Sequence, residues 1–160
     1  MATSKPTIST SFLYETLEET LDIKPLGAKL HIGIPKETAF QENRIALSPE
    51  AVGVLVSNGN EVSIEHLAGE GSHYSDADYS EAGARIVFDR HEIYKCPILV
   101  KSAPIVSEDL PLLQLNQIII SPIHYSALQQ ADIQKMMEKK ITALSFENFK
   151  DASGTYPIVR

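Results

Sequence analysis

The feature that most constrains the fold of this chain is an alternation of short apolar segments with helical patterns from residue 29 to residue 146. The apolar segments do not alternate polar and apolar side chains, which is typical of strands buried on both faces. Strands that alternate with helices in this way form a parallel sheet covered on both faces. We therefore predict an α/β fold of flavodoxin or Rossmann-like type, in which an open, mostly parallel sheet is the middle of three layers. The predicted strands cover residues 30–34, 62–65, 85–88, 97–100, 117–121 and 141–146.

Helix signals lie between the predicted strands. Ser48 followed by Pro49 predicts an N-cap and the first residue of a helix that ends at Asn58-Gly59. Asp89 to Glu92 has the pattern of a capping box, which predicts another helix start. Further helices are predicted over residues 75–82, 107–113 and 126–140.

The first 28 residues differ from the alternating region. Leu13, Leu17 and Leu21 recur on one face of residues 11–23, which predicts an amphipathic helix. Because three aligned leucines are costly to leave in water, we expect this helix to pack on the domain or on a neighbouring subunit. The predicted organisation is therefore an N-terminal extension, residues 1–28, followed by one domain over residues 29–160.

Composition excludes several classes of protein. The chain has 160 residues, enough for one domain, and its net charge of −7 with no basic cluster argues against a nucleic-acid partner. Cys96 is its only cysteine, so no intrachain disulfide can form, and the histidines lack metal-ligand spacing. No signal peptide or membrane-spanning run is recognisable, so we expect no membrane association and a cytoplasmic location.

The candidate site follows from the predicted sheet. Ligands of open parallel sheets bind beyond the carboxyl ends of the strands, and Arg44, Lys101 and His124 each follow a predicted strand. An arginine binds a carboxylate through two parallel hydrogen bonds, a lysine supplies a second cation for a keto oxygen, and a histidine exchanges protons near neutral pH. Together they predict a site for a small 2-oxo acid.

Each of these residues also has a structural interpretation. Arg44 and Lys101 could be exposed charges of a loop and a strand end, and His124 could be a hydrogen-bonded structural histidine. Glu147 follows the last predicted strand and could lie in the site or be a solvated carboxylate. Gly69-Glu70-Gly71 lies between a strand and a helix, but Tyr74 stands where a dinucleotide fingerprint needs its third glycine, so turn glycines are the better explanation.

Five segments resemble, in order, the alanine dehydrogenase and pyridine-nucleotide transhydrogenase family. The resemblance covers residues 29–160 and implies the N-terminal, substrate-binding domain of that family. The segments are "GIPKETAFQENRIALSP" at 33–49, "GNEVSIEHLAGEGSHYSDADYSEAGARIV" at 59–87, "ILVKSAP" at 98–104, "ISPIHYSA" at 120–127 and "KKITALSFENFKDASGTYPIVR" at 139–160.

The resemblance implies an NAD-dependent oxidoreductase that acts on the CH–NH2 group of an amino acid. Its most specific implication is alanine dehydrogenase, which converts L-alanine, NAD and water to pyruvate, ammonia and NADH in L-alanine catabolism. By matching position it implies that Arg44 and Lys101 bind the 2-oxo acid, and that His124, with Lys101, takes part in catalysis. It also implies that the full-length parent binds NAD and is a homo-oligomer.

The sequence departs from the family pattern in ways that keep alternatives open. Ser102-Ala103-Pro104 stands where the family usually has Glu-Pro and resembles the transhydrogenase branch, whereas His124 favours an amino-acid dehydrogenase. A domain of a saccharopine dehydrogenase, a transhydrogenase alpha subunit and a non-catalytic module that binds 2-oxo acids are the alternatives. The chain stops at Arg160, before the family's nucleotide-binding domain, so we expect this domain alone to bind no cofactor and to be inactive.

Overall fold

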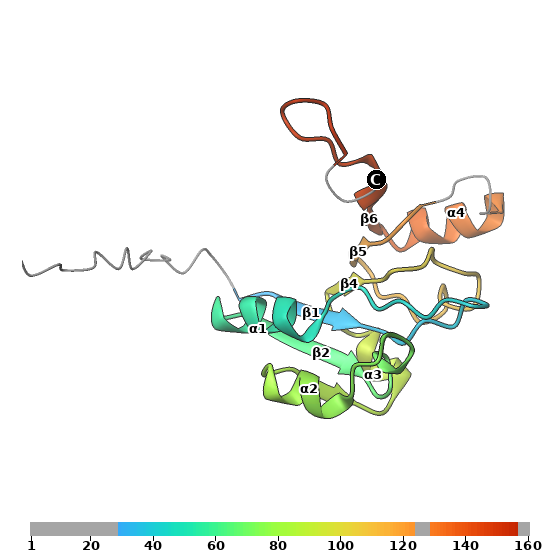
Figure 1. Cartoon of the computed structure of the whole chain (residues 1–160). Helices are drawn as coiled ribbons and strands as arrows, with labels where there is room; N and C mark the ends of the chain where they lie inside the picture. Colours follow the sequence, from blue (N-terminus) through green and yellow to red (C-terminus); the bar gives the residue numbers. More distant parts are fainter. Residues whose placement is uncertain (1–28, 124–128, 157–160) are drawn as a thin grey trace, which may run out of the picture.

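The computed structural model describes residues 29–123 and 129–156, and within them six strands form one sheet with every pair parallel (Figure 1). The order across the sheet is β3-β2-β1-β4-β5-β6. This confirms the predicted parallel α/β fold, and each predicted strand overlaps an observed one. The strands are β1 (His31–Ile34), β2 (Glu61–Glu65), β3 (Arg85–Val87), β4 (Ile98–Val100), β5 (Ile118–Ile120) and β6 (Thr142–Leu144).

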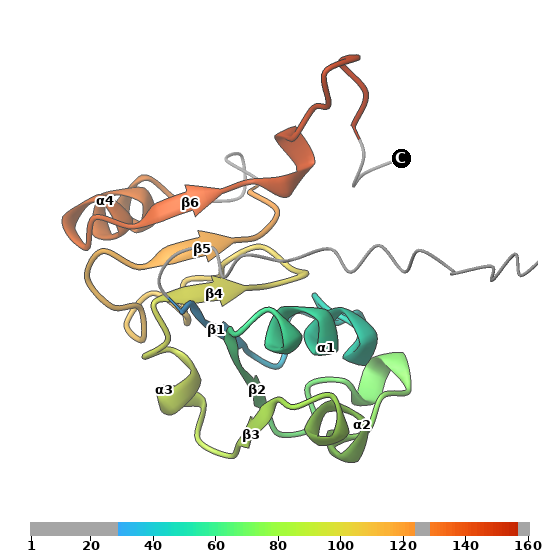
Figure 2. The same ribbon diagram turned by 90° about the vertical axis from the view of Figure 1, so that its left-hand side faces the viewer.

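Helices cover both faces of the sheet, as predicted (Figure 2). Helices α1 (Pro49–Ser57) and α2 (Asp76–Glu81) lie on one face, and α3 (Arg90–Ile93) and α4 (Gln130–Glu138) lie on the other. From β1 the chain moves outward to β2 and β3, and from β4 it moves the opposite way to β5 and β6. Because such crossovers are right-handed, opposite directions put the helices on opposite faces.

Two apolar clusters form the core, one on each side of the sheet. The first packs α1 and α2 against β1 and β2, and the second packs α3 and the chain between β4 and β5 against the sheet. The first includes Ile34, Val52, Val62, Ile64 and Tyr79, and the second includes Ile93, Tyr94, Leu99, Leu110, Leu113 and Ile119.

The signals at helix α1 act where the sequence predicts them. The Ser48 hydroxyl accepts a hydrogen bond from the Ala51 amide at the start of α1, and Gly59 follows the end of the helix with a φ of 86°. Helix α3 starts at the predicted place, with the Asp89 carboxylate accepting from the His91 amide as N-cap. The full capping box lies instead at α2, between Ser75 and Asp78, where the sequence analysis did not predict it.

Two expectations about the elements are wrong. Residues 107–112 form turns and no helix, because Pro111 lacks an amide hydrogen and disfavours helical geometry in the residue before it. The predicted strands were expected to be buried on both faces, but β6 is exposed along its whole length, since it lies at one lateral edge of the sheet. Helix α4 begins at Gln130, and the helix predicted over residues 11–23 lies outside the described residues. None of the helices described here has the length and apolar character needed to cross a membrane.

Candidate functional site

The candidate site lies where the strand order reverses. Strands β1 and β4 are neighbours, but the chain leaves them toward opposite edges of the sheet. Because all strands are parallel, their carboxyl ends lie along one rim of the sheet, which we call its carboxyl edge. Open sheets bind ligands in the crevice that forms there at such a switch point. The loop after β1 carries Glu37, Glu42 and Arg44, and Lys101 directly follows β4.

A cavity of about 580 Å³ opens at this edge. This volume lies within the range of small-molecule sites, roughly 300–1,000 Å³. Arg44 and Lys101 both line it, although they lie 57 positions apart in the sequence. Its other walls are mostly apolar and come from four strand ends; they include Ile45, Ala46, Leu47, Val100, Ile120, Phe146 and Phe149.

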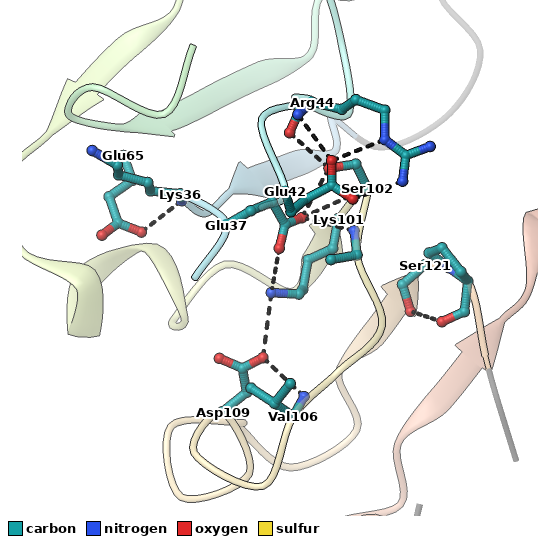
Figure 3. A network of polar contacts seen from close by, with 12 residues as sticks. Lys36, Glu37, Glu42, Arg44, Glu65, Lys101, Ser102, Val106, Asp109 and Ser121 are labelled. Carbon is teal, nitrogen blue, oxygen red and sulfur yellow. Dashed lines mark hydrogen bonds and ion pairs between the residues drawn. The ribbon is translucent and has the colours of Figure 1, made fainter. Parts of the chain in front are cut away.

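Lys101 is buried beneath this edge and is not an exposed strand-end charge. Its side chain is 2% exposed, and its Nζ lies 3.0 Å from Glu37 Oε2 and 3.3 Å from Asp109 Oδ2. A buried ammonium is tolerated only when carboxylates compensate the loss of hydration. The two carboxylates come from different loops, so Lys101 joins the segment after β1 to the connection between β4 and β5 (Figure 3).

Glu37 ties the loop after β1 to the loop after β4. Its Oε1 accepts hydrogen bonds from the Ser102 amide at 2.7 Å, the Ser102 hydroxyl at 3.2 Å and the Ala103 amide at 3.1 Å. Its Oε2 accepts no hydrogen bond within the described part of the chain and faces the Lys101 ammonium. One oxygen therefore holds the loops together, and the other compensates the lysine.

Asp109 is the second carboxylate on Lys101 and is itself fully buried. Its Oδ1 accepts from the Tyr94 hydroxyl at 2.6 Å and from Arg90 Nη2 at 3.0 Å, and its Oδ2 accepts from the Val106 amide at 3.3 Å. Burial acts to raise the pKa of the Asp109 carboxyl, but the Lys101 ammonium and these hydrogen bonds outweigh it and hold the pKa below its ordinary value. Asp109 therefore stays ionised beside Lys101.

Arg90 extends the polar network to the next strand. Its Nη1 donates to the Lys36 carbonyl at 2.9 Å and lies 3.3 Å from Glu65 Oε2, and its Nη2 donates to the Tyr94 hydroxyl at 3.1 Å. Burial and the nearby Asp109 carboxylate raise the pKa of the Tyr94 phenol, which therefore remains a hydrogen-bond donor. Hydrogen bonds of Arg90 therefore connect Glu65 at the end of β2 to Asp109 in the chain after β4.

Arg44 differs from Lys101 because its side chain is 76% exposed. Its Nε and Nη2 donate to the two carboxylate oxygens of Glu42, at 2.9 and 2.6 Å. This hydrogen bonding lowers the pKa of Glu42 to about 2. Figure 3 shows the Arg44 guanidinium and the Lys101 ammonium directed away from each other, so the two cations share a cavity wall without converging at their charged ends. His124 lies outside the described residues.

The glycines after β2 support the Arg44 loop. A Cβ at Gly71 would lie 2.7 Å from the Asn43 carbonyl oxygen, and the Ser72 hydroxyl donates to the same oxygen at 2.8 Å. Close packing against the neighbouring loop therefore requires Gly71.

Other chemistry is not supported by the described residues. They contain no cluster of histidine, cysteine and acidic side chains able to hold a metal ion. Cys96 is buried, and burial raises the pKa of its thiol, which makes it a poor nucleophile.

The sequence analysis missed most of the polar network. Arg90 begins a helix that was predicted only from its start, and Tyr94 caps the end of that helix. Asp109 lies in the segment wrongly predicted as a helix. One signal was available: a lysine after a buried strand requires a carboxylate if it is itself buried, and Glu37 and Asp109 follow the two neighbouring strands. The sequence does not say that Lys101 is buried.

The family model described as "Alanine dehydrogenase/PNT, N-terminal domain" matches residues 33–159. The alanine dehydrogenase of Staphylococcus epidermidis is 32% identical over 130 residues, which are 81% of this chain and 35% of that protein. That of Staphylococcus saprophyticus is 33% identical over 128 residues, or 80% and 34%. This chain therefore spans about a third of the length of these curated relatives.

Two solved structures with similar folds come from an alanine dehydrogenase and a transhydrogenase. A structure of an L-alanine dehydrogenase matches with a TM-score of 0.75 and 31% identity, over 80% of this chain and 35% of that chain. A transhydrogenase from Sinorhizobium meliloti matches with a TM-score of 0.67 and 26% identity, over 73% of this chain and 35% of that chain.

Proposed function

This chain belongs to the alanine dehydrogenase/PNT family, whose N-terminal domain it matches over residues 33–159, and we propose that it is the substrate-binding domain of an NAD-dependent alanine dehydrogenase. The proposed ligand is pyruvate in one direction and L-alanine in the other. The observation that carries the proposal is that Arg44 and Lys101, selected independently from the sequence, line one cavity at the switch point of the sheet.

Arg44 is proposed to hold the carboxylate of the ligand. A guanidinium has five N–H donors, and Glu42 engages only the edge formed by Nε and Nη2. A second carboxylate can therefore bind at the other edge without displacing Glu42. Because the side chain is mostly exposed, it can reorient toward the cavity with little loss of packing.

Lys101 is proposed to act on the keto oxygen. Its ammonium has three donors and is held by two carboxylates, Glu37 and Asp109, which leaves donor capacity for a ligand in the cavity. A fixed cation beside a carbonyl oxygen stabilises the negative charge that develops there during addition to the carbonyl carbon. His124, which follows the next strand, is proposed to exchange the proton as acid and base.

NAD is proposed to bind to a part of the parent protein beyond this chain. Gly71 packs against Asn43, and Tyr74 stands where a dinucleotide fingerprint needs its third glycine. The proposal for this chain is therefore binding of the amino acid or 2-oxo acid, and we expect no turnover from it alone. The oligomeric state of the parent and its cytoplasmic location stay predictions.

A transhydrogenase subunit is the second candidate. It is favoured by the structural match to the Sinorhizobium meliloti transhydrogenase and by Ser102-Ala103-Pro104 after the buried lysine. The two candidates differ in their ligands, because only the amino-acid dehydrogenase needs a pyruvate site at Arg44 and Lys101.

Titration calorimetry of the chain with pyruvate tests this proposal. We expect saturable binding that falls at least about tenfold in Arg44→Gln, because a charge-assisted bidentate contact is lost. Lys29→Met is the matched control, since Lys29 also forms an ion pair but lies before β1, at the opposite edge of the sheet. Equal pyruvate affinity in wild type and Arg44→Gln, or no binding to either, would contradict the proposal.

A further inference from the structure

The buried ammonium of Lys101 has a partner, Asp109, that the sequence analysis did not select as a site residue. Asp109 lies on the connection between β4 and β5, eight positions after Lys101, and both side chains are 2% exposed. We propose that Asp109 is a positioning residue, which fixes the Lys101 ammonium at the carboxyl edge of the sheet so that its remaining donor faces the ligand. This inference rests on the proposed function, since it gives Asp109 a role through a ligand-binding lysine.

The two carboxylate oxygens of Asp109 have different partners. Oδ1 is held by the Tyr94 hydroxyl and by Arg90, which anchors the carboxylate from the side of α3. Oδ2 is the oxygen on Lys101, at 3.3 Å, and it also accepts the Val106 amide. The carboxylate is therefore fixed at one end and presents the other to the lysine.

Glu37 also contacts Lys101, but it holds loops together as well. Three of its hydrogen bonds go to Ser102 and Ala103, so its removal would release the loops that form the cavity. Among the described residues, Asp109 makes no hydrogen bond to Ser102 or Ala103, and its Oδ2 accepts a hydrogen bond only from the Val106 amide. Its effect on the ligand is expected to pass through Lys101.

An asparagine at position 109 separates positioning from packing. The amide oxygen can still accept from Tyr94 and Arg90, which keeps the buried anchor. The amide nitrogen then faces Lys101 and Val106, and both of these are donors, so the ammonium loses its second partner and is repelled. Asp109→Asn therefore changes the lysine while it retains the shape of the site.

Tyr94→Phe is the matched control. It removes the hydrogen bond of 2.6 Å to the other oxygen of the same carboxylate and leaves the contact between Asp109 and Lys101 in place. Both variants lose a buried polar interaction, so we expect similar losses of stability on denaturation. A residue with a purely structural role would give the same site properties in both variants.

The first readout needs no ligand. In the chain labelled with 15N at lysine Nζ, we expect a Lys101 ammonium signal with slow hydrogen exchange, assigned by its loss in Lys101→Gln. Asp109→Asn should speed this exchange and shift the signal, whereas Tyr94→Phe should leave both near wild type. The inference is overturned if Asp109→Asn leaves the signal unchanged.

The second readout is pyruvate affinity by calorimetry. We expect Asp109→Asn to weaken binding about tenfold or more and Tyr94→Phe to change it less than about threefold, because a contact to a charged group is lost only in the first. If wild type binds pyruvate and Asp109→Asn binds it equally well, the inference fails and the proposed function stands. If wild type binds no pyruvate, the proposed function fails and the ammonium signal alone decides the inference.

If Asp109→Asn does not fold, the pair is tested from the lysine side. The Lys101 ammonium helps to hold the pKa of Asp109 below its ordinary value. In Lys101→Gln, the titration of the Asp109 carboxyl, followed by 13C NMR, should therefore move to higher pH. An unchanged titration would overturn the inference.

Discussion

At the scale of single residues, both predicted cations are held by carboxylates, but by different means. Lys101 is buried between Glu37 and Asp109, whereas Arg44 is exposed and bound along one edge by Glu42. A buried pair is rigid, and its loss leaves an uncompensated charge. An exposed pair contributes little to stability and can rearrange.

The contribution of the Glu42 and Arg44 pair should depend on pH. Because hydrogen bonding to Arg44 lowers the pKa of Glu42 to about 2 in the folded state, the pair stabilises the fold above the unfolded pKa of a glutamate, about 4.3. This stability is lost as the pH falls from there through about 2. At pH 7 we expect Glu42→Gln to lower the free energy of unfolding by at most about 1 kcal/mol, since Arg44 is exposed.

Urea denaturation of wild type and Glu42→Gln at several pH values measures this difference. It should be constant between pH 5 and 8 and shrink toward zero below pH 4. A difference that grows as the pH falls would show that Glu42 is not bound to Arg44 as a carboxylate. Glu108→Gln is a control for the loss of one acidic side chain on an exposed loop position.

At the scale of elements, the loop after β1 and the loop after β2 pack as one unit. Gly71 allows the contact, because any side chain there would collide with the backbone of Asn43. The sequence analysis favoured turn glycines over a dinucleotide fingerprint for Gly69-Glu70-Gly71. It could not find the actual role of Gly71, because the close approach of the two loops depends on the pairing of β1 with β2.

We expect Gly71→Ala to destabilise the chain by about 1–3 kcal/mol, the usual cost of overpacking. Gly53→Ala is the matched control. Gly53 lies within helix α1, and a Cβ there would lie 3.9 Å from the Ala82 carbonyl oxygen, an ordinary contact distance. There alanine should stabilise by about 0.5–1 kcal/mol, because glycine is costly inside a helix. Chemical denaturation of both variants measures these changes, and equal stability of Gly71→Ala and wild type would refute the packing role.

Other element predictions show what a sequence pattern can and cannot reveal. Caps such as Ser48 and the glycine after α1 are local, and their positions were predicted correctly. The helix predicted over residues 107–113 was wrong, because Pro111 disfavours a helix there. That error concealed Asp109, which lies in turns that face Lys101.

At the scale of the whole molecule, the order of the strands creates the site. The alternation of strands and helices predicts a parallel sheet, and the carboxyl-edge rule selects Arg44 and Lys101 as candidates. The alternation does not say which strands are neighbours. The adjacency of β1 and β4 brings Glu37 to Lys101, and only the three-dimensional structure provides it.

From the strand order, the cavity and the buried lysine, we propose that one small 2-oxo acid is bound by two cations, Arg44 and Lys101, which come from opposite sides of the switch point. In the structure the two charged ends point apart, so ligand binding requires the exposed Arg44 side chain to turn toward the cavity while Lys101 stays fixed. This motion is a specific expectation about the bound state.

A crystal structure of the chain with pyruvate bound tests this claim most directly. We expect the pyruvate carboxylate to contact the Arg44 guanidinium and the keto oxygen to lie within hydrogen-bond distance of Lys101 Nζ, with Glu37 and Asp109 still in contact with the lysine. Pyruvate bound away from both cations, or bound to Arg44 with its keto oxygen remote from Lys101, would contradict it.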